Sequence, residues 1–356
     1  MGKIKVFLGA YLNSTNAQNL NCLTLAKYIN KSKFQIYSLE IYNGNLDRVQ
    51  IPGVKTFFCF KPFKLSGLIG YLWGIYRCDI AYLPRGNMFR YNMFLLKVLN
   101  KRSFKTIENV LDDIVLPSAL AVYDTVEDMK KGYMMCSRLF SITEYMKHYN
   151  FNKYGIISEE RILKVPIDTQ KFSNKNKIIT SLKQIVFIGN DMIRKGIHDY
   201  IFLIQKFPDI KFIIIGSGEG KIDIPAIISQ NRLENTAYYR TLDHDKLIKV
   251  LEDCDLHVFP SHSEGFGKVV IEAAAAGVPS LLYGDYGANG WIDSWSNGII
   301  VSSKEEMAEA IQKLVEEPLL LQKLSEGALQ LQEEFDIEKT VRDYEDVIVE
   351  LYEEKK

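Results

Sequence analysis

Two successive sets of alternating strand and helix patterns constrain the fold of this chain more than any other feature. In the first set, short apolar runs typical of strands lie at 6–9, 34–39, 79–83 and 104–108, with helical patterns at 16–30 and 91–99. The second set has six such runs between 184 and 301, and helical patterns at 305–316, 318–334 and 337–353 end the chain. Because strands that alternate with helices form parallel sheets covered by helices, the sequence predicts an α/β fold with two such sheets.

Length and composition agree with two domains. At 356 residues the chain exceeds what one core normally serves, and its 47% hydrophobic content can fill two cores. We place the junction after an extended stretch at 163–167, which gives a first domain over 1–168 and a second over 169–335.

Charge is unevenly distributed although the net charge is zero. Residues 1–170 hold 23 Lys/Arg and 13 Asp/Glu, a net of +10, which the remainder of the chain balances. A basic first half suits an anionic acceptor or a membrane surface with anionic lipids, although solvated charges can also fall this way without a function. The stretch 55–76 mixes aromatic residues and lysines, as elements at a bilayer interface do; the alternative is a strand and a packed helix.

The five cysteines form no Cys-x-x-Cys pair and no cluster with histidines. We therefore expect no structural zinc or disulfide framework and a reducing, cytoplasmic compartment. We also expect no signal peptide, and no run approaches the ~20 apolar residues of a membrane-spanning helix.

The segment 261–280, SHSEGFGKVVIEAAAAGVPS, carries the most specific functional signal. A glycine-rich turn, Gly265-Phe266-Gly267, stands between a short strand and a helical run. Such a turn directs backbone N–H groups and the positive end of a helix dipole at one point, which suits a pyrophosphate. Glu264 and Glu272 flank the turn, and carboxylates suit the hydroxyls of a sugar and a ribose better than a phosphate. The alternative is an ordinary crossover turn with Glu272 on a solvated helix face.

This segment resembles the E-x7-E region of the retaining glycosyltransferases of family 4, which have the GT-B fold. The resemblance covers most of the chain and is strongest between about 184 and 280. It implies two Rossmann-like parallel-sheet domains that face a central cleft, with the acceptor on the first and the nucleotide sugar on the second. It also implies that a C-terminal helix over about 336–356 crosses back to the first domain.

The resemblance also assigns donor-binding residues. The family's diphosphate-binding lysine maps onto Lys195. The preceding basic position of the family is occupied by Asn190 in this chain, and Arg194 could supply the missing positive charge. Glu264, Lys195 and Arg194 are the expected catalytic residues, with Glu264 on the sugar and Glu272 on the ribose. The implied donor-binding set is Gly189, Asn190, Lys195, Arg240, Thr241, Leu242, Glu264, Gly265, Phe266, Gly267, Lys268 and Glu272.

The first domain departs from the family pattern. Many members carry a His after the strand that corresponds to 104–108, and this chain has none. Glu108, Asp112 or Asp113 could replace it by hydrogen-bonding the donor sugar; the alternative is that the two aspartates begin a loop and contact only water. Arg85, just after a strand end, is a further acceptor-side candidate.

We therefore expect an enzyme of the hexosyltransferase type. It would move a sugar from a nucleotide-diphosphate sugar to a hydroxyl of a glycan, glycolipid or other acceptor with retention, in cell-surface polysaccharide or glycolipid synthesis. We expect no metal or other cofactor, no nucleic-acid partner, and a peripheral place on the inner face of the plasma membrane. Two alternatives remain: a nucleotide-sugar epimerase on the same architecture, and a non-catalytic nucleotide-sugar-binding protein, which Asn190 and the missing His suggest.

Overall fold

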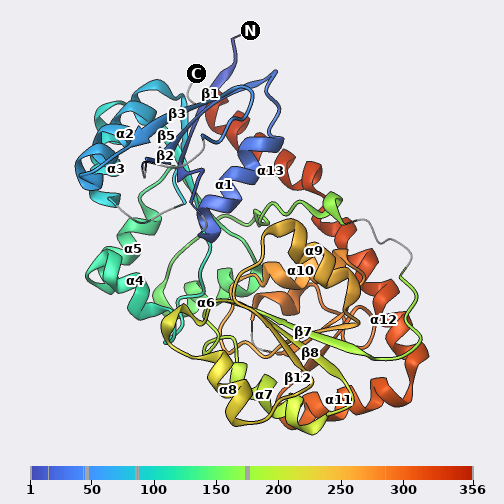
Figure 1. The fold of residues 1–356 in the computed structure, drawn as a ribbon. Helices are drawn as coiled ribbons and strands as arrows, with labels where there is room; N and C mark the ends of the chain where they lie inside the picture. The colour runs from blue at the N-terminus through green and yellow to red at the C-terminus, as the bar shows by residue number, and fades with distance from the viewer. Residues whose placement is uncertain are drawn as a thin grey trace. The chain divides into compact units, whose positions relative to one another are not determined.

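The computed structural model describes the chain apart from residues 1, 15, 43, 45–47, 85, 87, 173–176, 285 and 355–356. It contains two compact units (Figure 1). The first comprises Met1–Ile167 and Ile337–Lys356, and the second comprises Asp168–Asp336. The sequence-based boundaries at 168 and 335 lie one residue from these limits.

The first unit is built on a six-stranded sheet in the order β3-β2-β1-β4-β5-β6, with parallel pairing throughout the described residues. The strands are β1 (Ile4–Tyr11), β2 (Phe34–Ile41), β3 (Val54–Cys59), β4 (Ile80–Tyr82), β5 (Arg102–Ile107) and β6 (Arg138–Ser141). The helices are α1 (Ala17–Tyr28), α2 (Phe63–Arg77), α3 (Phe89–Val98), α4 (Leu116–Tyr123), α5 (Val126–Met134), α6 (Glu144–Tyr154) and α13 (Ile337–Glu353).

Helix α13 ends the chain but belongs to the core of the first unit. Its apolar face, which includes Val341, Tyr344 and Ile348, is buried in one cluster with residues of β1, β4, β5 and α1. The Tyr344 ring lies edge-on to Tyr82, with ring centroids 5.7 Å apart. Because a buried aromatic or aliphatic side chain contributes about 1.5–3 kcal/mol to stability, burial of this face is sufficient to hold α13 on the first sheet.

The stretch 55–76 forms β3, a loop and α2, which is the strand and helix that the sequence offered as the alternative to a bilayer element. Within the part of the chain that the structure describes, no helix combines the length and apolar character needed to span a bilayer. Contact with a membrane surface remains a prediction.

The second unit repeats this plan with a six-stranded sheet in the order β12-β11-β10-β7-β8-β9, again parallel. Its strands are β7 (Gln184–Ile188), β8 (Lys211–Ile215), β9 (Thr236–Tyr239), β10 (Leu256–Phe259), β11 (Ser280–Tyr283) and β12 (Gly298–Val301). Its α-helices are α7 (Ile197–Lys206), α8 (Ile224–Gln230), α9 (His244–Asp253), α10 (Lys268–Ala275), α11 (Lys304–Glu316) and α12 (Pro318–Leu331). The two-sheet α/β prediction is confirmed.

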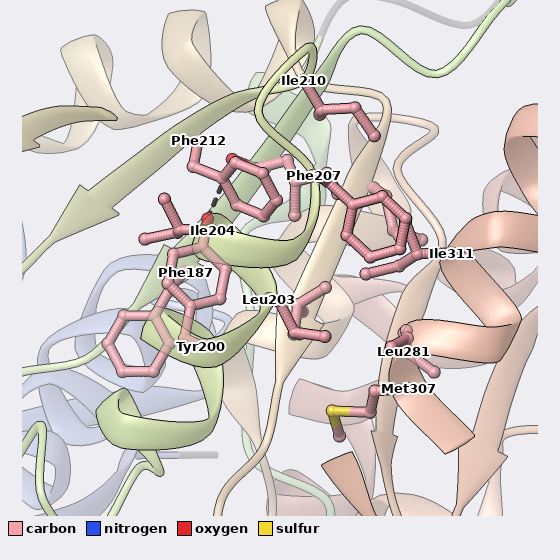
Figure 2. Packing of buried hydrophobic residues seen from close by; sticks show 14 of the residues in the cluster. Phe187, Tyr200, Leu203, Ile204, Phe207, Ile210, Phe212, Leu281, Met307 and Ile311 are labelled. Atoms are coloured by element: carbon pink, nitrogen blue, oxygen red, sulfur yellow. Dashed lines mark hydrogen bonds between the residues drawn. The ribbon is translucent and has the colours of Figure 1, made fainter. Parts of the chain in front are cut away.

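Helix α7 is fixed to its sheet by a dense apolar core (Figure 2). Tyr200 is fully buried between Phe187 and Phe212, and its hydroxyl lies 3.0 Å from the carbonyl oxygens of both Ile185 and Ile213. A buried hydroxyl without a partner would cost about 1–3 kcal/mol, so these carbonyls hold the helix in one place. The loop that precedes α7 is therefore held against the end of β7.

Both sheets reverse their strand order at one point, between β1 and β4 in the first and between β7 and β10 in the second. In open α/β sheets, ligands bind beyond the carboxyl ends of the strands at such a reversal. In the second unit, the loops that follow β7 and β10 therefore delimit the expected site.

Candidate functional site

The loops after β7 and β10 touch at a glycine. Gly196 caps α7 with a φ of 77°, and a Cβ built on it would lie 2.0 Å from the carbonyl oxygen of Pro260. Only glycine allows this approach in this conformation. A second link is the N–H of His262, which donates to the carbonyl of Arg194 at 2.9 Å. The two loops thus form one surface at the point where the strand order reverses.

Four charged side chains meet on this surface. Lys195 Nζ forms an ion pair with Glu264 Oε2, and Arg194 Nη1 lies 3.4 Å from the same oxygen. Arg194 also donates to the carbonyl of Ser263, and Lys195 Nζ lies 4.5 Å from the centroid of the Phe259 ring. The side chains of Lys195 and Glu264 are only 12% and 16% exposed. Arg194 Nε also lies 3.4 Å from Asp191 Oδ2, so two cations and two carboxylates are held together here.

The electrostatics of this cluster favour the ionised form of Glu264. Burial alone would raise the pKa of Glu264, but the adjacent Lys195 and Arg194 together lower it below its ordinary value. Burial lowers the pKa of Lys195, and Glu264 opposes that effect. An anion that entered beside the two cations would replace Glu264 as their partner and free its carboxylate for another contact.

The turn after Glu264 forms a rigid helix start. Gly267 adopts a φ of 74° as the N-terminal cap of α10, a conformation that favours glycine. The Phe266 ring is buried against Trp291 and Phe335, with centroids 4.9 and 5.8 Å away. The amino end of α10, which begins at Lys268, follows Glu264 and the turn directly in the sequence. Helix amino ends attract anions through their N–H groups and dipole.

Glu272 lies one turn further along α10 and is 6% exposed. Its Oε1 is 3.4 Å from Lys268 Nζ and 3.8 Å from His244 Nε2. Burial would raise the pKa of Glu272, but His244 and Lys268 lower it. The alternative of a solvated helix face is wrong. His244 could not be recognised from the sequence, because no spacing links the first residue of α9 to a position on α10.

Other predicted donor-binding residues have defined local roles. The Asn190 side chain accepts the N–H of Ser217 at 3.1 Å and so ties the loop after β7 to the loop after β8. Gly189 leaves room for Lys195, since a Cβ would lie 2.8 Å from its Cγ. Arg240 and Thr241 are exposed between β9 and α9, and Leu242 packs on the core. Their contact with a nucleobase remains a prediction.

Two histidines lie near the site, His257 buried and His262 exposed. His257 is fully buried, and its Nδ1 lies 2.9 Å from the Ser280 hydroxyl, while its Nε2 has no partner. Burial and the neighbouring Lys195 lower the pKa of His257 to about 3, so the ring is neutral. His262 stacks on Tyr283 and lies 3.8 Å from Asp199, so its ring is engaged outside the ion cluster.

The acceptor-side candidates in the first unit differ in their surroundings. Glu108 lies directly after β5, and its carboxylate accepts hydrogen bonds from Asn21 at 2.9 Å and from Thr106 at 3.1 Å. The hydroxyl of Tyr82 lies 3.4 Å away. Burial raises the pKa of Glu108 to about 7 despite these donors. The first unit thus holds a buried carboxyl whose pKa lies close to neutral pH.

The two aspartates do not contact water alone, as the alternative had it. Asp112 Oδ1 accepts the N–H groups of Ile114 and Val115 and starts the turn into α4, while Asp113 pairs with Lys153 at 2.6 Å. Arg85 lies outside the described residues. Among the residues that are described, no group of three or more His, Cys, Asp or Glu side chains could hold a metal ion.

Comparisons with known proteins identify a family match within the second unit and solved structures with the same fold. Residues 168–331 match the model of the family Glycosyl transferases group 1. The capsular polysaccharide biosynthesis glycosyltransferase CapM of Staphylococcus aureus is 28% identical over 214 residues, which cover 54% of this chain and 56% of CapM. The chain thus spans little more than half the length of that relative.

Two solved structures share the fold along nearly all of both chains. Sucrose-phosphate synthase from Thermosynechococcus elongatus has a TM-score of 0.80 at 14% identity and covers 98% of this chain and 99% of its own. Anabaena HepE in complex with UDP-glucose has a TM-score of 0.76 at 14% identity, with 98% and 100% coverage. The chain therefore has the two-domain GT-B fold, and most of its second unit matches the Glycosyl transferases group 1 model.

Proposed function

We propose that the chain is a retaining glycosyltransferase of the family 4 type that takes its sugar from a nucleotide-diphosphate sugar. The observation that carries the proposal is the cluster of Lys195, Arg194 and Glu264 where the strand order reverses, beside the amino end of α10. The match of residues 168–331 to the group 1 family supports it, as does the UDP-glucose bound to HepE.

The diphosphate would bind to the two cations and to the N–H groups at the start of α10. In the ligand-free chain, Glu264 neutralises Lys195. The incoming diphosphate would take over this pairing, and the freed carboxylate of Glu264 would accept hydrogen bonds from the hydroxyls of the donor sugar. Glu272, held by Lys268 and His244, would accept hydrogen bonds from the ribose.

During transfer, the bond between the anomeric carbon and the diphosphate oxygen breaks, and a bond to the acceptor oxygen forms on the same face. The acceptor proton passes to the departing phosphate oxygen. Lys195 and Arg194 would stabilise the charge that develops on the leaving group, the task that a metal ion has in other transferases. We therefore predict that a chelator such as EDTA leaves turnover unchanged.

For the acceptor, we propose a glycan or a lipid-linked glycan precursor at the cytoplasmic face of an anionic membrane. CapM, named for capsular polysaccharide biosynthesis, and the basic first half of the chain support this class. Glu108 is the acceptor-side residue that we propose to lie near the reacting sugar.

Incubation of the protein with a panel of nucleotide sugars, with and without lipid-linked acceptors, tests the proposal. A transferase consumes donor in the presence of an acceptor, and NMR of the product would give an unchanged anomeric configuration. Conversion of the donor without an acceptor would identify an epimerase. Binding without any turnover would identify a nucleotide-sugar-binding protein, and inversion would refute the family 4 mechanism.

A further inference from the structure

Apart from Lys64, Ser66 and Arg77, the residues of α2 are apolar or glycine on both its buried and its exposed face. Its inner face is buried on the sheet and is made largely of small residues, such as Gly67, Gly70 and Gly74. At Gly74 a Cβ would lie 2.2 Å from the Phe7 ring, so the helix sits too close to the sheet for larger side chains. The large apolar side chains of α2 are therefore divided between the two faces. Those on the outer face do not take part in packing the helix against the sheet.

The outer face of α2 forms a continuous exposed stripe. Leu65, Ile69, Leu72 and Tyr76 follow at intervals of four, three and four residues, which places them on one line of the helix, and each is between 41% and 65% exposed. Phe60 and Phe63, which lie just before and at the start of α2, are exposed as well. These six residues are called the α2 surface below. The neighbouring helix α3 adds two further exposed apolar residues, Phe94 and Val98.

Such a surface marks a site of contact, because soluble monomers rarely expose large apolar patches without a use. The charges that flank it in the sequence indicate the partner. Residues 48–107 hold 11 Lys/Arg and a single acidic residue, Asp79, whose carboxylate accepts the backbone N–H of Lys5. Lys61 and Lys64 stand at one end of the α2 surface and Arg77 at the other. A second copy of the chain would bring the same positive charge, whereas an anionic bilayer offers the opposite charge and an apolar interior.

We propose that the α2 surface inserts into the boundary between headgroups and acyl chains of an anionic bilayer, while Lys61, Lys64 and Arg77 contact the headgroups. The inference deepens the proposed function by naming the bilayer itself as a partner, and it rests on that function only for the place of a lipid-linked acceptor. Insertion predicts two components of binding. The apolar part persists at high salt, and the cationic part is screened as the Debye length falls from ~10 Å at 0.1 M to ~3 Å at 1 M.

Flotation with phosphatidylcholine vesicles, with and without phosphatidylglycerol, measures both components. Ile69→Gln with Leu72→Gln should weaken binding about tenfold for each residue at every salt concentration, because each removes an inserted apolar side chain. Lys61→Gln with Lys64→Gln should remove the salt-sensitive part, at about fivefold for each residue. The matched control is Ile178→Gln with Leu319→Gln, which changes two exposed apolar residues of the second unit and should leave binding unchanged.

Insertion has a direct spectroscopic signature. A Leu72→Trp variant should shift its emission to the blue with anionic vesicles, and lipids brominated on their acyl chains should quench it. Absence of quenching, or equal binding of the Ile69→Gln/Leu72→Gln variant and the wild type, would overturn the proposal. So would a concentration-dependent dimer that this variant abolishes, since the surface would then bind a second copy. Calorimetric titration of the same variants with nucleotide sugars, without vesicles, tests the donor site separately.

Discussion

Replacement of Glu108 by Gln tests the electrostatics of the first unit quantitatively. The carboxyl of Glu108 is hydrogen-bonded by Asn21, Thr106 and Tyr82, but burial outweighs these donors and raises its pKa from 4.5 to about 7. A buried carboxyl of this kind favours its protonated form in the native state. Folding and protonation of Glu108 are therefore linked.

The sign and size of the linkage follow from the two pKa values. In the unfolded chain the group titrates near 4.5, so between that pH and about 7 the native state binds more protons than the unfolded state. The free energy of unfolding must therefore fall as pH rises through this window. A difference of about 2.5 units corresponds to about 3 kcal/mol at full ionisation, at 1.36 kcal/mol per unit.

Urea unfolding of wild type and Glu108→Gln near pH 5 and pH 8, followed by circular dichroism, measures this linkage. Near pH 5 the variant should be less stable by about 1 kcal/mol, because an amide cannot accept all the hydrogen bonds of the carboxyl. By pH 8 the free energy of unfolding of the variant should have risen by up to about 3 kcal/mol relative to that of wild type. Glu127→Gln, at an exposed position of α5, is the control and should show no such change. If the free energies of unfolding of wild type and Glu108→Gln changed with pH in parallel, the proposed linkage would be refuted.

Three further predictions concern the second unit. Glu272→Gln should weaken binding of free nucleoside diphosphate about tenfold in calorimetry, because a neutral amide accepts a ribose hydrogen bond less strongly. Glu264→Gln should spare or tighten free nucleotide binding, since it removes the partner of Lys195, yet reduce turnover of the full donor; full turnover would contradict its role. Gly196→Ala should lower the free energy of unfolding by about 3 kcal/mol through strain and the Pro260 contact. Gly290→Ala, with open space around its Cβ, should change it by less than about 0.5 kcal/mol, and equal losses would refute the argument.

The architecture could be predicted from periodicity because most strands of these sheets are buried on both faces. Such strands are continuous short apolar runs, as at 184–189, where the structure has β7 over Gln184–Ile188. The stretch 55–76 was harder to predict, since an exposed apolar helix face resembles both a packed helix and a bilayer element. The structure shows the helix and leaves its outer face exposed.

Pairings between distant segments could not be predicted, because they depend on strand order. Lys195 and Glu264 are 69 positions apart and meet because β7 and β10 are neighbours in the sheet. From the sequence, these two residues were expected to contact different parts of the ligand, and their mutual ion pair is visible only in the fold. Asn190 could likewise be recognised as a departure from the family, but not as the side chain that ties two loops together through Ser217.

Calorimetric titration of wild type and Lys195→Ala with nucleoside diphosphates and their sugar conjugates tests the central claim most directly. The account predicts that at least one nucleotide sugar binds, and that Lys195→Ala weakens it and the free diphosphate alike, by about 10- to 100-fold, because both present the same anion to Lys195. Equal affinities in the two proteins, or no binding across the panel, would contradict a donor diphosphate at this cluster.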